Sequence, residues 1–308
     1  MQHNILVIKL SALGDFIIAL GAMEAIRKKH PDARITLLTT PMFKDMATRS
    51  KYFDEVWALP RAKAWQLPAW FDLFKKLNAG NFTRVYDLQM NDRTRVYYTM
   101  LLKKPEWSGV IKGSALFYAN PDYKKLHAFK RHQEVLNVAG IDAKLPDISW
   151  MNTELGPLAL KKPYILLVPG SAPQHPQKRW PALRYAALAS KLIRDGYTVA
   201  ALGTKAEAEV IETIKKGCPA LVDLSGKTSF YDIATLAKDA AGAVGNDTGP
   251  THLVSLAGCP VMVLFSASSN PALSAPVGPS VSVIQSDDLN DVQVDDVMKN
   301  FKPRELAA

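Results

Sequence analysis

The first forty residues alternate between apolar runs and polar breaks in a regular order. The continuous apolar run ILVIKL, residues 5–10, is typical of a buried parallel strand. After the loop SALGD, the stretch FIIALGAMEAIRKKH has apolar residues at helical spacing and ends in cations, which suit a helix C-terminus. Pro31 and Asp32 end this helix, and RITLLTT predicts a second strand. The pattern therefore predicts a strand–helix–strand unit with a right-handed crossover.

The same alternation continues to the end of the chain. In the first half, EVWAL and RVYDL predict strands at 55–59 and 84–88, with a helix at 68–78 between them. A similar unit restarts at residue 164, with strands expected at 164–170, 197–203, 220–224, 241–246 and 260–265 and helices at 181–196, 206–216, 230–240 and 251–258. Strands that alternate with helices predict an α/β protein with doubly wound sheets.

The chain is expected to form two domains. Its 308 residues are long enough for two, and the least regular stretch, 147–163, lies near the middle. We therefore predict domains at 1–155 and 156–308, with a C-terminal helix that is free to pack back on the first domain. Two such domains that face each other enclose a central cleft, with ligands at the C-terminal ends of the strands.

The composition indicates a cellular compartment and shows that charge is distributed unevenly along the chain. No apolar run approaches the roughly 18 residues that span a membrane, and the two cysteines, Cys218 and Cys259, favour a reduced, cytoplasmic setting. The net charge is +9, and residues 1–150 carry all of it, with 23 Lys and Arg against 14 Asp and Glu. This half is expected to meet an anionic partner such as nucleic acid, an acidic membrane surface or an acidic substrate. An ordinary soluble basic surface is the alternative.

The turn GNDTGPTHLVSLAGCP, residues 245–260, is the first candidate site. It joins a predicted strand to a predicted helix, where Asp247 or Thr248 can cap the helix and Pro250 suits its first turn. The free amides at such a helix start favour a phosphate, and Gly249 allows close approach. The helix dipole opposes protonation of His252, which predicts a neutral hydrogen-bond donor. The alternative is a capped helix with a structural histidine.

Four further loops follow predicted strands. PGSAPQHPQKRWP offers donors at Ser171 and cations at Lys178 and Arg179, which suit a departing diphosphate, unless these cations are only solvated. In LSALGDF, Asp15 is placed either to take a proton from a hydroxyl or merely to cap its helix. Glu207 and Thr228 are placed to meet a ribose or base, or simply to start helices.

Several motifs are absent from the sequence. It contains no D-x-D, G-x-G-x-x-G, Walker A, H-E-x-x-H or G-x-S-x-G motif. We therefore expect no metal and no resident cofactor. A nucleic-acid-binding protein is the non-enzymatic alternative, although no reading module or basic–aromatic platform is evident.

Taken together, the loops resemble glycosyltransferase family 9, the heptosyltransferase family of lipopolysaccharide core assembly. The resemblance covers nearly the whole chain. It rests on the opening stretch with Ser11, Gly14 and Asp15, on the loop VPGSAPQHPQKRWP, and on NDTGPTHLVSLAGCPVMVLF. The chain departs from the family at Met90, where glycine often follows the Gln of DLQ, and at SASSNP after the last core strand.

The resemblance implies a GT-B fold of two Rossmann-like domains. It also implies an inverting, metal-independent transfer of a sugar, expected to be heptose from ADP-heptose, to a lipopolysaccharide inner-core acceptor. Asp15 would be the catalytic base. The donor would be contacted by Ser171, Lys178, Glu207, Thr228, Asp247, Thr248, Gly249 and His252, and the acceptor by Arg61, Lys63 and Gln89.

The expected partners are a nucleotide sugar, an anionic lipid-linked saccharide and the cytoplasmic face of the inner membrane, with no nucleic acid. The two-cysteine count speaks against the family's iron-binding, protein-modifying branch. The enzymatic alternative is a GT-B nucleotide-sugar 2-epimerase, which would need no acceptor.

Overall fold

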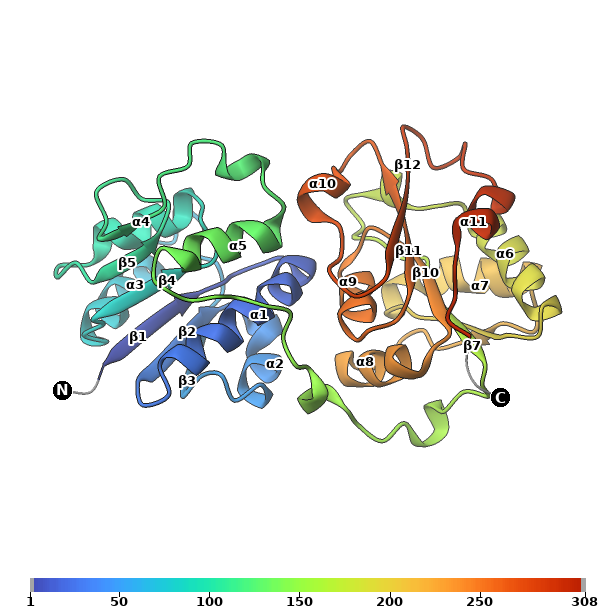
Figure 1. The fold of residues 1–308 in the computed structure, drawn as a ribbon, viewed down its shortest axis with the longest axis horizontal. Coiled ribbons are helices and arrows are strands. Elements are labelled where there is room, and N and C mark those ends of the chain that lie inside the picture. Colours follow the sequence, from blue (N-terminus) through green and yellow to red (C-terminus); the bar gives the residue numbers. More distant parts are fainter. Residues whose placement is uncertain (1–2, 306–308) are drawn as a thin grey trace. The chain divides into compact units, whose positions relative to one another are not determined.

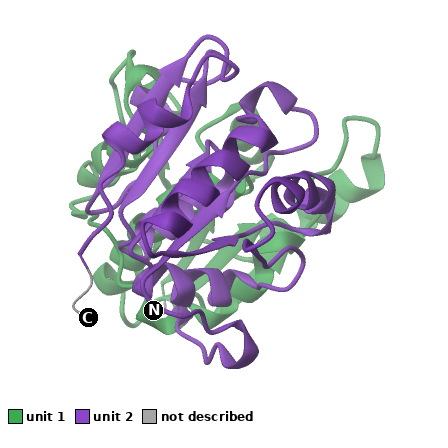
Figure 2. Cartoon of the chain, turned by 90° about the vertical axis from the view of Figure 1, so that its right-hand side faces the viewer, with its two compact units in different colours: residues 1–150 green, residues 151–308 purple. Residues whose placement is uncertain are grey.

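The chain folds into two compact units, residues 1–150 and residues 151–308, shown in separate colours in Figure 2. The structure, a computed structural model, describes residues 3–305. Each unit contains one parallel six-stranded sheet with helices on both faces (Figure 1), which confirms the predicted α/β doubly wound class. The boundary between the units lies inside the irregular stretch at 147–163.

The sheet of unit 1 has the strand order β3-β2-β1-β4-β5-β6, which is the Rossmann order. Its strands are β1 (Asn4–Ile8), β2 (Arg34–Thr39), β3 (Glu55–Ala58), β4 (Arg84–Asp87), β5 (Glu106–Gly109) and β6 (Leu116–Phe117). β1 lies at the centre, where Ile5 pairs with Ile35 of β2 on one side and with Arg84 of β4 on the other. Since every pair is parallel, all strand C-termini lie at one edge of the sheet.

The helices of unit 1 cover the sheet in two layers. They are α1 (Leu13–Lys29), α2 (Lys44–Arg49), α3 (Leu67–Ala79), α4 (Asp92–Met100) and α5 (Ala128–Asn137). Alternate side chains of β1, Leu6 and Ile8, pack in one core with Leu73 and Leu77 of α3 and Tyr97 of α4. On the other layer, α1 packs against α5.

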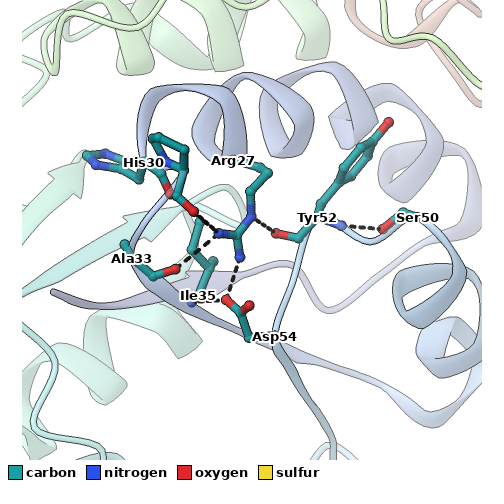
Figure 3. Close-up of polar contacts among 8 residues, drawn as sticks. Arg27, His30, Ala33, Ile35, Ser50, Tyr52 and Asp54 are labelled. Atoms are coloured by element: carbon teal, nitrogen blue, oxygen red, sulfur yellow. Dashed lines mark hydrogen bonds and ion pairs between the residues drawn. The ribbon is translucent and has the colours of Figure 1, made fainter. Parts of the chain in front are cut away.

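Arg27 fastens the C-terminal end of α1 to the strands beside it (Figure 3). Its Nε donates to the carbonyl of Tyr52, and its Nη1 donates to the carbonyl of Ala33, at 2.9 and 3.0 Å. Its Nη2 pairs with Asp54 Oδ2 at 2.5 Å, and the same oxygen accepts the amide of Ile35 at 2.7 Å. The cluster lies at the start of β2, so it is a structural clamp at the sheet edge opposite the strand C-termini.

Unit 2 repeats the arrangement. Its sheet order is β12-β11-β10-β7-β8-β9, again the Rossmann order when read from β9. The strands are β7 (Tyr164–Val168), β8 (Thr198–Ala201), β9 (Val222–Asp223), β10 (Gly242–Asn246), β11 (Val261–Ser266) and β12 (Val281–Ser286). The helices are α6 (Ala182–Arg194), α7 (Ala208–Gly217), α8 (Phe230–Asp239), α9 (Gly249–Leu256), α10 (Pro271–Ser274) and α11 (Val294–Asn300).

The core of unit 2 lies under α6, α7 and α11. Ile165 and Leu167 of β7 pack there with Leu188 of α6 and Val297 of α11. The other layer is formed by α8 and α9, which pack against each other. The C-terminal helix α11 thus contacts α6 of its own unit.

The sequence pattern did not predict every element, and α4 and β12 are two examples. α4, DRTRVYYTM, is too polar to show a clear apolar stripe, and β12, VSVIQS, is a partly exposed edge strand. Both are held by neighbours, α4 against α3 and β12 along β11, so tertiary contacts rather than local periodicity specify them. α1 begins at Leu13, three residues before the predicted start. No helix within residues 3–305 is both long and apolar enough to cross a bilayer.

Candidate active site

The candidate residues gather at the C-terminal edges of the two sheets. In a sheet with the Rossmann order, successive strands are added first on one side of the first strand and then on its other side. Ligands bind at the switch point between these two directions. In unit 1 the switch lies between β1 and β4, which lead to Asp15 and Gln89. In unit 2 it lies between β7 and β10, which lead to Lys178 and Asp247. The topology therefore gives each unit one ligand-binding edge.

Asp15 occupies the first turn of α1. Ala12 is the N-cap of α1, and Asp15 is the third helical residue. The alternative that Asp15 itself is the N-cap residue is therefore wrong in its position. Its Oδ2 accepts the Ala12 amide at 3.2 Å, and the side chain is half-buried. One carboxylate oxygen thus helps to hold the helix start, while the group keeps further acceptor capacity for a substrate hydroxyl.

Gln89 holds the loop that precedes Asp15. Its Oε1 accepts the amides of Leu10 and Ser11, at 2.8 and 3.3 Å. The backbone that carries Gln89 is fixed in turn by Asp87, whose Oδ1 accepts the amides of Gln89 and Met90, at 3.1 and 2.8 Å. The side chain predicted to contact the acceptor therefore joins the end of β4 to the end of β1.

Met90 adopts a left-handed backbone conformation with φ of 49°. Glycine adopts this conformation without a steric penalty, whereas a side chain is strained there. Here the Met90 side chain is buried, so apolar packing offsets the backbone strain.

A buried polar cluster lies beneath this loop, and it was not predicted from the sequence. Lys9 Nζ donates to the carbonyl of Leu88 at 3.3 Å, and His132 Nε2 lies 3.1 Å from the same oxygen. Burial lowers the pKa of Lys9, against the opposing charge of Asp15, and burial raises the pKa of Asp87 to about 6. The only sequence signal was a lysine inside the apolar run ILVIKL.

We expect Gln89→Met to lower the turnover number by about 10- to 100-fold with little change in the acceptor KM. The variant keeps the length of the side chain but loses the oxygen that holds Leu10 and Ser11, and a loop shift of about 1 Å at a reacting group costs up to 10²-fold. Gln89→Glu keeps that acceptor and serves as the matched control. Steady-state kinetics check the prediction. A raised acceptor KM at normal turnover would instead make Gln89 an acceptor contact.

Arg61 extends the site of unit 1, whereas Lys63 lies further out. Arg61 Nη1 donates to Ser11 Oγ at 3.1 Å, which places the guanidinium beside the Asp15 loop. The ammonium of Lys63 lies 5.2 Å from the centre of the exposed Trp65 ring. Both cations are exposed, so both remain accessible to an anionic ligand.

A cavity of about 380 Å³ lies beside Arg61. It is lined by Leu10 after β1, by Leu38 within β2, by residues after β3 such as Leu59, by α3, and by Tyr97 of α4. Arg61, Lys76 and Asp72 also line it, so a mostly apolar cavity carries two cations and one carboxylate. It is therefore suited to part of an anionic amphiphile rather than to a free inorganic ion.

In unit 2, Lys178 and Asp247 form a tight pair. Lys178 Nζ lies 2.6 Å from Asp247 Oδ2, and His252 Nε2 lies 3.9 Å from the other oxygen, Oδ1. Burial opposes ionisation of Asp247, but the polar groups of His252, Lys178 and Ser269 outweigh it and lower its pKa to about 2. The carboxylate is charged at neutral pH and holds the ammonium at the end of β7, with other N–H groups left to donate.

The start of α9, which lies beside this pair, has no side-chain cap. Thr248 is the N-cap of α9, but its side chain makes no capping hydrogen bond, and the Asp247 carboxylate is engaged by Lys178 instead. Pro250 lies in the first turn, as predicted. The predicted side-chain cap is thus absent because Asp247 has a cation as partner. The positive end of the α9 dipole therefore remains available to an anion.

Asn246, which in the sequence is one of several turn-forming residues, joins the two loops of this site. Its Oδ1 accepts the Trp180 amide at 3.1 Å and the Tyr185 hydroxyl at 3.0 Å, and its Nδ2 donates to the Pro169 carbonyl at 2.7 Å. Gly245 before it permits the approach, since an added Cβ would lie 2.8 Å from Val168 Cβ. These contacts fix the Lys178 loop against the Asp247 turn.

Ser171 is buried within its own loop. Its Oγ donates to the His175 carbonyl at 2.9 Å and accepts from Arg179 Nε at 3.0 Å. Arg179 Nη2 also donates to the Ser171 carbonyl at 3.0 Å. Arg179 is therefore a structural cation here, and Lys178 is the cation that the loop presents to Asp247.

Glu207 and Thr228 lie after the neighbouring strands β8 and β9. The Glu207 carboxylate accepts the Thr204 amide at 2.8 Å, and its side chain packs against Gly170, where an added Cβ would lie 2.6 Å from Glu207 Cγ. Thr228 is half-buried just before Ser229, the N-cap of α8. Glu207 thus starts a helix, as the alternative held, while both residues occupy the same sheet edge as Lys178.

The described residues gather no group of three or more His, Cys, Asp or Glu side chains that could hold a metal ion. Cys218 and Cys259 are both buried and free, and burial raises the pKa of Cys259 to about 12.

Comparison with known proteins identifies the family of this chain. Over 130 residues, 41% of this chain and 37% of the relative, the sequence is 32% identical to lipooligosaccharide heptosyltransferase 2 of Haemophilus influenzae. The fold resembles the family 9 glycosyl transferase of Veillonella parvula, with a TM-score of 0.78 and 21% identity over 97% of this chain and 95% of that one. It also resembles an Escherichia coli heptosyltransferase solved with ADP, with a TM-score of 0.76 and 19% identity over 96% and 98% of the chains.

A family model covers most of the chain. The model described as glycosyltransferase family 9 (heptosyltransferase) matches residues 70–302, which include all of the candidate donor residues and Gln89. Asp15, Arg61 and Lys63 precede the matched range, while the structural likeness to the two solved structures covers 97% and 96% of this chain. The chain therefore belongs to glycosyltransferase family 9, the heptosyltransferase family of lipopolysaccharide core biosynthesis.

Proposed function

We propose that the protein is an inverting, metal-independent transferase that moves heptose from ADP-heptose to an anionic, lipid-linked inner-core acceptor of lipopolysaccharide. The observation that carries this proposal is the Lys178–Asp247 pair at the uncapped start of α9. A cation, a helix dipole and free amides at one sheet edge suit a diphosphate. The relatives are named heptosyltransferases, and one neighbouring structure was solved with ADP.

In the proposed reaction, unit 2 holds the donor. Lys178 and the first amides of α9, near Thr248 and Gly249, donate to the diphosphate, and His252 lies within reach of the adjoining sugar. As the bond from the anomeric carbon to the diphosphate oxygen breaks, ADP leaves with that electron pair. The preorganised cation and dipole stabilise the departing charge, as a metal ion does in other transferases.

Unit 1 holds the acceptor in this proposal. Asp15 takes the proton of the acceptor hydroxyl, and the oxygen forms the new bond to the anomeric carbon on the face opposite the diphosphate, so the configuration inverts. Arg61 and Lys63 neutralise acidic groups of the acceptor, which agrees with the excess of positive charge in residues 1–150. A lipid-linked acceptor places the enzyme at the cytoplasmic face of the inner membrane.

The test measures release of ADP from ADP-heptose with and without an inner-core acceptor, in excess EDTA. We expect release only with the acceptor, no loss of rate in EDTA, and a product of inverted anomeric configuration by nuclear magnetic resonance. Nucleotide release without any acceptor would instead indicate an epimerase. A strict requirement for added Mg²⁺ or Mn²⁺ would refute the metal-independent mechanism.

We expect the double substitution Arg61→Ala and Lys63→Ala to raise the acceptor KM about tenfold or more while the donor Kd stays nearly unchanged. Each exposed cation contributes an interaction with a charged partner of about 1 kcal/mol or somewhat more. Steady-state kinetics and calorimetric titration separate the two effects. Lys112→Ala with Lys144→Ala, two exposed cations elsewhere in unit 1, is the control. Lost donor affinity with normal acceptor kinetics would reverse the roles of the units.

A further inference from the structure

An exposed apolar stripe runs along α3 and the loop before it. Trp65, Leu67 and Phe71 have exposed fractions of 73%, 71% and 55%. Ten large apolar side chains are exposed among the described residues, and these three fall within seven positions. Leu67 and Phe71 are four residues apart, so they lie on one face of α3, while Leu73 and Leu77 on another face are buried in the core. The stripe is therefore largely exposed to solvent.

Lysines accompany the stripe closely. The ammonium of Lys75 lies 4.3 Å from the centre of the Phe71 ring, and that of Lys63 lies 5.2 Å from the centre of the Trp65 ring. Residues 61–79 carry four Lys or Arg and a single acid, Asp72. A helix with aromatic and aliphatic side chains on one face and lysines beside them is suited to the interface of an anionic bilayer, where apolar groups enter and ammonium groups meet the headgroups.

The stripe also adjoins the proposed acceptor region. It lies in the segment that begins with Arg61, whose guanidinium contacts Ser11 of the Asp15 loop. Ala69 and Asp72 of the same helix line the cavity beside Arg61 (α3 and α4 in Figure 1). An acceptor whose lipid stays in the bilayer would present its sugar from the membrane surface, so a membrane-bound α3 would bring Arg61 close to it.

We propose that Trp65, Leu67, Phe71 and Lys75 form a membrane-docking surface that seats unit 1 on an anionic lipid bilayer. This inference rests on the proposed function in one respect only, namely that the acceptor is lipid-linked and is presented from the bilayer. The chemistry of binding, apolar insertion with lysine–headgroup attraction, stands apart from catalysis. Leu67, Phe71 and Lys75 have no role in the proposed transfer.

Vesicle sedimentation of the full chain tests the surface. Vesicles of phosphatidylcholine alone are compared with vesicles that also contain about 30% phosphatidylglycerol, at low and high salt. We expect the wild type to bind the anionic vesicles and to dissociate at high salt. Leu67→Ser with Phe71→Ser should weaken this binding about tenfold or more, and Lys75→Gln should weaken it by a smaller factor.

Leu183→Ser is the matched control, because Leu183 of α6 in unit 2 is 69% exposed and lies outside the surface. It should bind vesicles like the wild type, and melting curves of all variants should match. A double variant that binds like the wild type would overturn the proposal. So would a wild type that ignores anionic vesicles, in which case the stripe is a docking face for a protein.

Activity measurements distinguish a failure of the membrane-docking proposal from a failure of the proposed function. With a water-soluble acceptor fragment that has no acyl chains, Leu67→Ser with Phe71→Ser should keep wild-type turnover. With the acceptor in vesicles, its rate should fall in parallel with binding. If the wild type transfers no heptose at all, the proposed function fails, yet vesicle binding by the wild type and its loss in the double variant would still support the surface.

Discussion

Asp15→Asn should lower the turnover number by about 10²- to 10⁴-fold, the usual contribution of acid–base catalysis. The amide cannot accept a proton at neutral pH, so the acceptor hydroxyl would lose its base. Its Oδ1 can still accept the Ala12 amide, which the carboxylate now accepts at 3.2 Å, so the start of α1 should persist. Steady-state rates, a melting curve and a donor titration on the one variant check all three expectations.

The alternative for Asp15 predicts the opposite kinetic result. If the carboxylate only caps α1, the variant should turn over almost normally and lose at most a little stability. A stable, donor-binding variant that keeps more than about a tenth of wild-type turnover would exclude Asp15 as the base. Asp45→Asn, at an exposed site in the first turn of α2, is the control for a general effect of removing an acid at a helix start.

Lys178→Ala should both slow transfer and destabilise unit 2. Removing a preorganised charge from a departing oxyanion costs about 10²- to 10³-fold in turnover, and donor affinity should fall as well. The substitution also leaves the buried Asp247 carboxylate without the ammonium at 2.6 Å, which costs about 1–3 kcal/mol of the free energy of unfolding. Calorimetric titration with ADP-heptose and a melting curve measure the two effects.

The stability effect should depend on pH in a defined direction. The pKa of Asp247 in the folded protein is about 2, below the ordinary 3.8, so its ionised form stabilises the fold above about pH 4. That contribution is lost as the pH falls toward 2. The difference in melting temperature between wild type and Lys178→Ala should therefore be largest near neutral pH and should shrink as the pH falls from 4 toward 2.

A surface pair in the same unit supplies the control. Lys162 Nζ lies 2.9 Å from Asp239 Oδ2, but both side chains are solvent-exposed, so the pair contributes little. Lys162→Ala should change neither donor affinity nor the melting temperature by a measurable amount. Equal losses in Lys162→Ala and Lys178→Ala, or normal donor affinity and turnover in the latter, would remove Lys178 from the donor site.

The sequence by itself determined the fold class and predicted the location of both candidate sites. Strands buried on both faces must be apolar throughout, and amphipathic helices must show a 3.6-residue period, so β1, β7 and α6 were evident from the pattern. Special residues after these strands marked the ligand-binding edges, because in a parallel sheet all such loops lie at one edge. The polar helix α4 and the edge strand β12 carried too weak a period to be found.

Only the tertiary structure decided what each polar side chain contacts. In the sequence Gln89 and Asn246 are only two polar residues after strands, yet each connects two loops through partners that lie some 60–80 residues away along the chain. The partner of Asp247 is Lys178, 69 residues away, rather than its own helix. Local sequence constrains backbone conformation through nearby sterics and hydrogen bonds, whereas partners such as these are set by strand order and burial, which exist only once the chain has folded.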